Sequence, residues 1–137
     1  MNWKKNPLKD CRLYAILDRQ VLGDADFRGF AMKLKGLPLD IVQLRDKISG
    51  KNTVYRNALA LAGIFSKQKT LFIVNDHPDI AALVNCDGVH LGQDDLPVEA
   101  ARKLLGRKKI IGVSCHSLKQ ALEAERRGPD YIGIGPV

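Results

Sequence analysis

Short apolar runs alternate along this chain with longer stretches of mixed apolar and charged residues. Runs of this length, bounded by turn residues, are typical of β-strands. The predicted strands are Leu13–Leu17, Leu39–Leu44, Leu71–Val74, Gly88–Leu91, Ile110–Val113 and Tyr131–Ile134. The stretches between them are amphipathic, as expected for helices. Strands that alternate with helices predict a parallel sheet with right-handed crossover connections.

Capping residues delimit the helices expected between these strands. Ser, Thr or Asp commonly precedes a helix, Pro occupies its first turn, and Gly follows its last residue. By these signals a short helix opens at Pro78, and longer ones run from Asp26 to Gly36, Thr53 to Ser66, Pro97 to Gly106 and Ser117 to Gly128.

The second predicted strand indicates which parallel fold to expect. Val42 and Leu44 share one face, whereas Gln43, Arg45 and Lys47 share the other, because side chains alternate along a strand. The later strands repeat this contrast between an apolar face and a small or polar one. A doubly wound sheet favours apolar residues on both faces, whereas a barrel has one helix-covered face and one interior. The predicted fold class is therefore α/β, a TIM-type (β/α) barrel.

Six strands fall short of the eight that close such a barrel. At about 30 residues per βα unit, about 60 further residues are needed. We therefore interpret residues 1–137 as a single incomplete (β/α) barrel domain, truncated at its carboxyl end, with residues 1–12 as an N-terminal lead-in segment. Two sheet edges would stay unpaired, and self-association could cover them.

The composition excludes several classes of protein. No apolar run approaches the ~20 residues of a membrane helix, and the amino terminus lacks the apolar segment of a signal peptide. The three cysteines, Cys11, Cys86 and Cys115, have no metal-binding spacing, so a reduced cytoplasm is the expected location. The net charge of +7 comes from short clusters without interleaved aromatic residues. We therefore expect no nucleic-acid partner, and a basic protein suits small anionic substrates.

Acidic and amide side chains follow two neighbouring predicted strands. Asn75 and Asp76 come directly after the third strand, and Asp94 and Asp95 follow the fourth. The carboxyl ends of parallel strands meet at one edge of a sheet, and oxygen-only ligands suit Mg²⁺. The competing role for Asp76 is to cap the helix that opens at Pro78. We favour a magnesium site that serves a phosphorylated substrate.

The chain resembles the thiamine phosphate synthase family in five consecutive segments, LYAILD, QLRDK, VNDHPDIAALVNCDGVHLGQDDLPVEAARKLLG, IIGVSCHS and GPDYIGIGPV. Members of that family are TIM barrels that function in thiamine diphosphate biosynthesis. They join 4-amino-2-methyl-5-hydroxymethylpyrimidine diphosphate to a thiazole phosphate and release pyrophosphate. The resemblance implies a transferase with these two small-molecule substrates and with Mg²⁺ as its cofactor.

The resemblance also implies roles for individual residues. The substrate-binding residues that it implies are Gln43, Leu44, Arg45, Asp46, Lys47, Asn75 and Ser114. Asp76 and Asp95 are the implied magnesium ligands. Catalytic roles are assigned to Arg45, Lys47 and Ser114. Arg45 and Lys47 lie on the same strand face, from which a guanidinium fork and a point charge can reach one diphosphate.

The mechanism implied by the family is electrophilic. Departure of the diphosphate leaves a carbocation on the pyrimidine methylene, and the thiazole nitrogen captures it. No protein nucleophile is needed, so neither Cys115 nor His116 receives that role. His90, on the interior face of its predicted strand, is expected to be a hydrogen-bonded structural histidine.

The chain also departs from the family pattern. Complete members continue past the GPV segment into a threonine- and lysine-bearing loop for the thiazole phosphate, and into two further strands whose turns bind a phosphate. We therefore expect little or no turnover by residues 1–137 alone. The alternatives are a thiazole tautomerase-like relative and a non-catalytic remnant that only binds ligand. The intact set of Arg45, Lys47, Asp76 and Asp95 favours the synthase.

Overall fold

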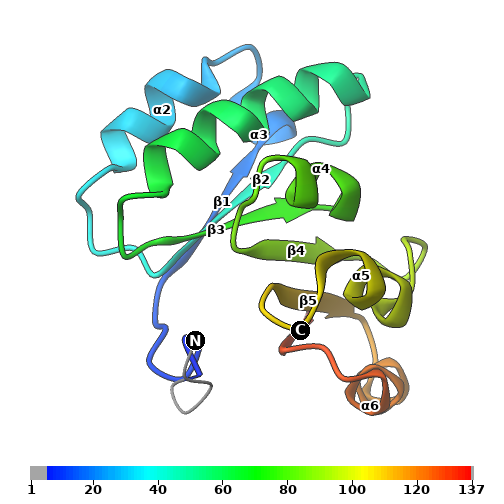
Figure 1. Ribbon diagram of the computed structural model, residues 1–137. Coiled ribbons are helices and arrows are strands. Elements are labelled where there is room, and N and C mark those ends of the chain that lie inside the picture. The colour runs from blue at the N-terminus through cyan, green and yellow to red at the C-terminus, as the bar shows by residue number, and fades with distance from the viewer. Residues whose placement is uncertain (1–5, 137) are drawn as a thin grey trace.

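The computed structural model describes residues 6–136, which form one six-stranded parallel sheet with helices between the strands (Figure 1). The strands are β1 (Tyr14–Asp18), β2 (Ile41–Arg45), β3 (Leu71–Asn75), β4 (Gly88–Leu91), β5 (Ile110–Cys115) and β6 (Tyr131–Ile134). The helices are α1 (Arg19–Leu22), α2 (Phe27–Leu34), α3 (Lys51–Phe65), α4 (Pro78–Leu83), α5 (Val98–Leu105) and α6 (Leu118–Arg127).

Each strand pairs with the next one along the chain, so the order across the sheet is β1-β2-β3-β4-β5-β6. The helices pack on one side, and the sheet curls around the other side as half of a barrel (Figure 1). Across residues 6–136 this architecture confirms the predicted α/β barrel with six of its strands. None of the helices in this part of the chain combines the length and the apolar character needed to cross a membrane.

Two hydrophobic clusters lie on opposite faces of the sheet. The outer cluster, under the helices, includes Val42, Leu44, Val74 and Ile111. The inner cluster is built from Ile41, Ile73 and Ile110, against which Leu8, Cys11, Tyr14, Leu71 and Tyr131 pack. Because this inner cluster includes the first residues of β2 and β5, it fills the amino-terminal end of the half barrel. Polar residues occupy the carboxyl-terminal end of the half barrel.

Several predicted helix ends are confirmed. The Asp26 carboxylate accepts hydrogen bonds from two backbone N–H groups in the first turn of α2, both at 3.0 Å. The Ser117 hydroxyl accepts one from the first turn of α6 at 3.2 Å. Gly128 ends α6 in the left-handed conformation that favours glycine, with φ 74°.

Three helix starts differ from the predictions. Helix α3 begins at Lys51, so Thr53 does not cap it, and the Thr53 N–H donates to the carbonyl of Gly50 at 2.9 Å. Pro97 is the residue before α5 rather than part of its first turn. The sequence pattern does not predict α1, because four residues are too few to show a helical period. Asp18 caps α1 through its side chain.

Candidate active site at the carboxyl ends of the strands

Polar residues gather at the carboxyl ends of the strands, on the concave side of the half barrel. Gln43 and Arg45 belong to β2, Asn75 ends β3, and Ser114 lies near the end of β5. All four line one cavity of about 520 Å³. The structure thus brings together four of the predicted substrate-binding residues.

Lys47, Asp76 and Asp95 form a second group beside this cavity. The Lys47 ammonium lies 3.1 Å from Oδ2 of Asp76, and the carboxyl group of Asp95 is close enough to that of Asp76 for the two to interact. Asp76 directly follows Asn75, and its N–H donates to the carbonyl of His90 at 2.8 Å. The two predicted magnesium ligands and a predicted phosphate-binding cation therefore meet.

The backbone of Asp76 adopts the left-handed conformation, with φ 64°. This conformation costs a non-glycine residue about 1 kcal/mol, and aspartate is among the residues that tolerate it best. The residue at the cap position of α4 is His77, whose side chain makes no capping hydrogen bond. The structure therefore does not show the alternative role of Asp76 as a helix cap, and its carboxylate is directed to Lys47 and Asp95 instead.

The environment of Asp95 disfavours its negative charge. Burial, the hydrogen bond with Asp76 and the charge of Asp76 raise the pKa of Asp95 above its ordinary value. The Gly92 N–H, which donates to Oδ2 of Asp95 at 2.6 Å, and the Lys47 charge act in the opposite direction. Two carboxylates this close repel each other unless a proton or a cation lies between them. A divalent cation would therefore be stabilised at this pair.

The donor set fits one particular kind of magnesium site. Among residues 6–136, no group of three or more His, Cys, Asp or Glu residues comes together as metal ligands. In phosphate-handling sites, however, Mg²⁺ is held by one or two carboxylates, while water and substrate phosphates complete its octahedral coordination. Asp76 and Asp95 supply that number of carboxylates.

Arg45 forms an ion pair with Asp18, its register partner at the end of β1. Both oxygens of Asp18 are engaged, one by Arg45 and the other by the first turn of α1, which holds the guanidinium in place. One nitrogen of Arg45 makes this contact, and a guanidinium has five N–H donors. Donors therefore stay available for an anion. Asp18 is a positioning partner that the sequence reasoning missed.

Besides Lys47, two predicted substrate-binding side chains do not line the cavity. Leu44 is buried in the outer cluster. Asp46 is 6% exposed, and its Oδ1 accepts the backbone N–H groups of Ile48 and Ser49 at 3.1 and 2.9 Å. Burial acts to raise the pKa of Asp46, but these hydrogen bonds and the Arg19 charge hold that pKa below its ordinary value. Asp46 therefore stabilises the loop that follows β2 and carries Lys47.

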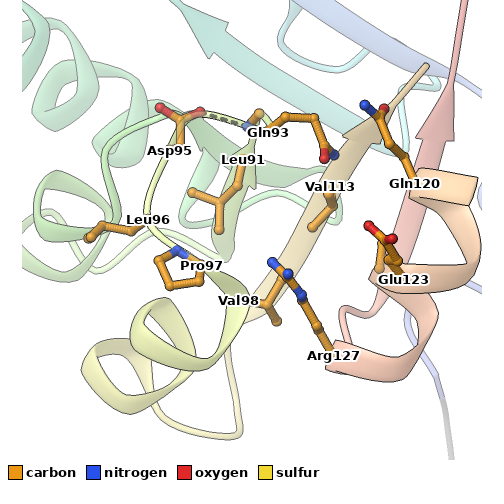
Figure 2. Close-up of a pocket in the computed structure, with 12 residues that line it drawn as sticks. Leu91, Gln93, Asp95, Leu96, Pro97, Val98, Val113, Gln120, Glu123 and Arg127 are labelled. Carbon is orange, nitrogen blue, oxygen red and sulfur yellow. Dashed lines mark hydrogen bonds between the residues drawn. The ribbon is translucent and has the colours of Figure 1, made fainter. Parts of the chain in front are cut away.

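A smaller cavity of about 170 Å³ lies next to Asp95, between the β4–α5 loop and α6 (Figure 2). The Asp95 carboxylate turns toward the backbone of its own loop, whereas Arg127 extends from α6 on the other side of the cavity (Figure 2). Gln93 ties the loop to β5, because its Nε2 donates to the carbonyl of Ser114 at 2.6 Å. The position of Asp95 is therefore fixed relative to Ser114.

Five side chains inside the half barrel form one continuous chain of hydrogen bonds, the inner polar network of Gln43, Tyr14, Tyr131, His90 and Ser114. Gln43 Nε2 donates to Oη of Tyr14 at 2.7 Å, and the two tyrosine hydroxyls are 2.7 Å apart. The Tyr131 hydroxyl lies 2.8 Å from Nδ1 of His90. Nε2 of His90 lies 2.7 Å from Oγ of Ser114. The predicted hydrogen bonding of His90 in the interior is confirmed.

The inner polar network is uncharged near neutral pH. Burial lowers the pKa of His90 to about 4, and the nearby Asp95 charge opposes this only in part. Burial also raises the pKa of Tyr14 and of Tyr131 above their ordinary values. His90 is therefore a neutral imidazole with a single N–H.

Sequence reasoning does not select Tyr14 and Tyr131 as part of the site. One signal was available for Tyr14, because period-two alternation along β1 puts it on the same face as Asp18. The space for Tyr131 depends on Gly112 in the neighbouring strand. A Cβ atom at Gly112 would meet Cζ of Tyr131 at 2.0 Å, so only glycine leaves room for that ring.

The chain is similar to thiamine phosphate synthases in sequence and in structure. The family model described as thiamine monophosphate synthase matches residues 13–137. The chain is 45% identical to the thiamine-phosphate synthase of Halalkalibacterium halodurans and 48% identical to that of Shouchella clausii, over 130 residues in each case. Each alignment covers 95% of this chain and 62% of the relative.

A solved structure is similar to this chain as well. Thiamine phosphate pyrophosphorylase from Pyrococcus furiosus superposes with a TM-score of 0.80 and 36% identity. The superposition covers 96% of this chain and 62% of that one. The chain therefore spans less than two thirds of the length of these relatives.

Proposed function

The chain belongs to the thiamine monophosphate synthase family, and on this premise we propose that it acts as a thiamine phosphate synthase. The proposed reaction joins 4-amino-2-methyl-5-hydroxymethylpyrimidine diphosphate to a thiazole phosphate and releases pyrophosphate. The observation that supports it most directly is the ion pair of Lys47 with Asp76, whose carboxyl group neighbours that of Asp95. This group adjoins the cavity that contains Gln43 and Ser114.

In this proposal the pyrimidine ring occupies the cavity of about 520 Å³, a volume in the usual range for small-molecule sites. Gln43, Asn75 and Ser114 offer it amide and hydroxyl groups. The diphosphate extends toward Arg45 and Lys47, whose charges stabilise the negative charge that grows on the departing oxygens. Leu44 and Asp46 could contact the substrate only through their main chains, given where their side chains lie.

Asp76 and Asp95 would hold Mg²⁺. When bound there, the ion would stabilise the charge of the diphosphate as it leaves. The residues of the chain supply the rest of this stabilisation, through the Arg45 guanidinium, which Asp18 fixes, and the Lys47 ammonium.

The residues of this site bind and orient the substrates, and no side chain attacks them. Burial raises the pKa of the Cys115 thiol, and Cys115 is 0% exposed, so no reactive thiolate forms. Nδ1 of His116 lies 2.5 Å from the carbonyl oxygen of Gly135 and donates to it. The proposal therefore retains the electrophilic route, in which the thiazole nitrogen captures a pyrimidine carbocation.

We also propose a cytoplasmic setting and self-association. Cys11, Cys86 and Cys115 are free thiols, which suits a reducing compartment. Within residues 6–136, β1 and β6 are the edge strands of the sheet, and they carry Ile16 and Ile134, which are 53% and 60% exposed. Unpaired strand edges with exposed apolar residues favour a covering partner. Light scattering over a range of protein concentrations tests this association.

Calorimetric titration with the pyrimidine diphosphate separates the synthase from its alternatives, once circular dichroism has shown a folded chain. A synthase binds this ligand more tightly with Mg²⁺ than with EDTA. A tautomerase-like protein, which has no need of a diphosphate site, would show no such binding, and this result would refute the proposal. Pyrophosphate release on addition of thiazole phosphate then distinguishes a synthase from a protein that only binds ligand.

A further inference from the structure

The hydrogen bonds of the inner polar network have a direction. Gln43 donates its amide N–H to Oη of Tyr14, so the single proton of the Tyr14 hydroxyl is free for Tyr131, 2.7 Å away. Either hydroxyl can donate to the other, and when Tyr14 donates, the proton of Tyr131 is left for Nδ1 of His90, 2.8 Å away. Each hydroxyl thus accepts from one side and donates to the other.

The tautomer of His90 follows from this direction. A neutral imidazole has one N–H and one acceptor nitrogen. In this direction Nδ1 accepts from Tyr131, which puts the proton on Nε2, the nitrogen that lies 2.7 Å from Oγ of Ser114. A phenol is a more acidic donor than an aliphatic hydroxyl. The imidazole lone pair therefore accepts a stronger hydrogen bond from Tyr131 than it would from Ser114. The proton of Ser114 is then left for a group in the cavity.

We propose that the inner polar network presents Ser114 to the cavity as a hydrogen-bond donor, with His90 as the positioning residue that enforces this polarity. The group that Ser114 selects is therefore an acceptor. For the aminopyrimidine of the proposed function, on which this identification rests, the acceptor is a ring nitrogen rather than the amino group. A ligand that offers only a donor at that point would leave the Ser114 proton unpaired, which disfavours its binding.

The packing around the network restricts it to this arrangement. Gly112 gives the Tyr131 ring its space, since any Cβ there would lie 2.0 Å from Cζ. The rings of Tyr14 and His90 flank Tyr131, with centroids 6.0 and 5.4 Å from its own. Gln43 and His90 are 3% and 9% exposed, so bulk water does not replace their hydrogen bonds. The network is thus a built part of the cavity wall.

Nitrogen NMR of the ligand-free protein tests the proposal without reference to its activity. Histidine-labelled protein gives separate signals for His77, His90 and His116, and a His90→Gln variant assigns that of His90. We expect the Nε2–H tautomer at His90. The Nδ1–H tautomer would mean that the hydrogen bonds from His90 to Tyr14 run in the opposite direction and that Ser114 is an acceptor, and it would overturn the proposal.

A variant of Tyr131 tests the consequence for binding. Tyr131→Phe removes the hydroxyl that fixes His90, and we expect it to weaken binding of the pyrimidine diphosphate about 5- to 10-fold, the value of one hydrogen bond. Binding of inorganic pyrophosphate should stay within about twofold, because the network does not touch the diphosphate side. Tyr55→Phe, a change in α3 outside the network, is the matched control.

The outcomes separate this proposal from the proposed function. Equal losses for both ligands in Tyr131→Phe would show a general structural defect and would overturn the role of the network. If the unmodified protein binds no pyrimidine diphosphate, the proposed function fails, whereas the tautomer of His90 still decides the polarity of Ser114.

Discussion

The Lys47 ammonium lies 3.1 Å from the carboxylate of Asp76, whose charge acts on the neighbouring carboxyl group of Asp95. One cation thus accompanies two carboxyl groups, and the lysine side chain is 46% exposed. A diphosphate that arrives with Mg²⁺ would bring a cation for the carboxylates and an anion for the lysine. Lys47 and the two carboxyl groups would thus exchange partners when the substrate binds.

Lys47→Ala should weaken binding of the pyrimidine diphosphate about tenfold, because a charge-assisted hydrogen bond to phosphate is lost. Calorimetry in the presence of Mg²⁺ measures this. Lys51→Ala is the matched control, since Lys51 also forms an ion pair with an aspartate, Asp79, at 2.6 Å, and neither residue belongs to the proposed site. Equal losses in the two variants would show that only the general positive charge of the protein matters.

Asp95→Asn should stabilise the chain in the absence of Mg²⁺, because it removes the repulsion between two neighbouring carboxyl groups. Relief of about 1 kcal/mol corresponds to a rise in Tm of about 3 °C for a chain of this size. Added Mg²⁺ should raise the Tm of the wild type and leave that of Asp95→Asn unchanged. Asp94, the exposed neighbour of Asp95, provides the control, because the Tm of Asp94→Asn should still rise with Mg²⁺. A full response to Mg²⁺ in Asp95→Asn would remove that residue from the site.

Gly112→Ala should lower the free energy of unfolding by about 1–3 kcal/mol, the usual cost of forcing an extra methyl group into a packed site. The new Cβ would lie 2.0 Å from Cζ of Tyr131, so the ring must move. Gly133→Ala is the matched control on the next strand, where the nearest atom would be 3.8 Å away. Urea denaturation measures both variants, and similar costs for the two would contradict the close packing of Gly112 with Tyr131.

Asp40 should contribute stability that depends on pH. Its Oδ2 accepts the backbone N–H groups of Arg12 and Leu13 at 2.7 and 2.8 Å, and these hydrogen bonds lower its pKa in the folded state. The stabilisation is therefore complete above the unfolded pKa of about 4 and is lost as the pH falls through the lower folded value. Urea denaturation should show wild type to be more stable than Asp40→Asn at pH 7. The gap should narrow in acid, and a gap that widens in acid would contradict the assignment.

The parts of the fold that depend on local pattern were predictable from the sequence. Alternation along the chain predicts β2, with Gln43 and Arg45 on its interior face. The start of α3 was not predictable in this way, because Gly50 accepts the first backbone N–H groups with its carbonyl and leaves Thr53 inside the helix. A backbone carbonyl leaves no signature in the sequence, and so Thr53 was the better candidate by residue type alone.

Only those residues of the site that lie at the ends of predicted strands were predictable from the sequence. Asp76 and Asp95 follow neighbouring strands, so their meeting could be expected. The contact between Tyr14 and Tyr131 joins residues 117 positions apart, across the concave side of the half barrel. Such a contact depends on the curvature of the sheet and on the missing side chain of Gly112, neither of which a single strand pattern contains. For Asp46, an acidic residue in a motif was assigned to substrate although its carboxylate binds its own loop.

In the proposed function, Asp76 and Asp95 hold a divalent cation against the diphosphate that Arg45 and Lys47 bind. Phosphorus NMR of the bound pyrimidine diphosphate, with Mn²⁺ in place of Mg²⁺, locates this cation, because a paramagnetic ion broadens only the phosphorus signals close to it. We expect strong broadening of both phosphorus signals in wild type and its loss in an Asp76→Asn, Asp95→Asn double variant that still folds. Broadening that persists undiminished in the double variant would place the cation elsewhere and would rule out Asp76 and Asp95 as its ligands.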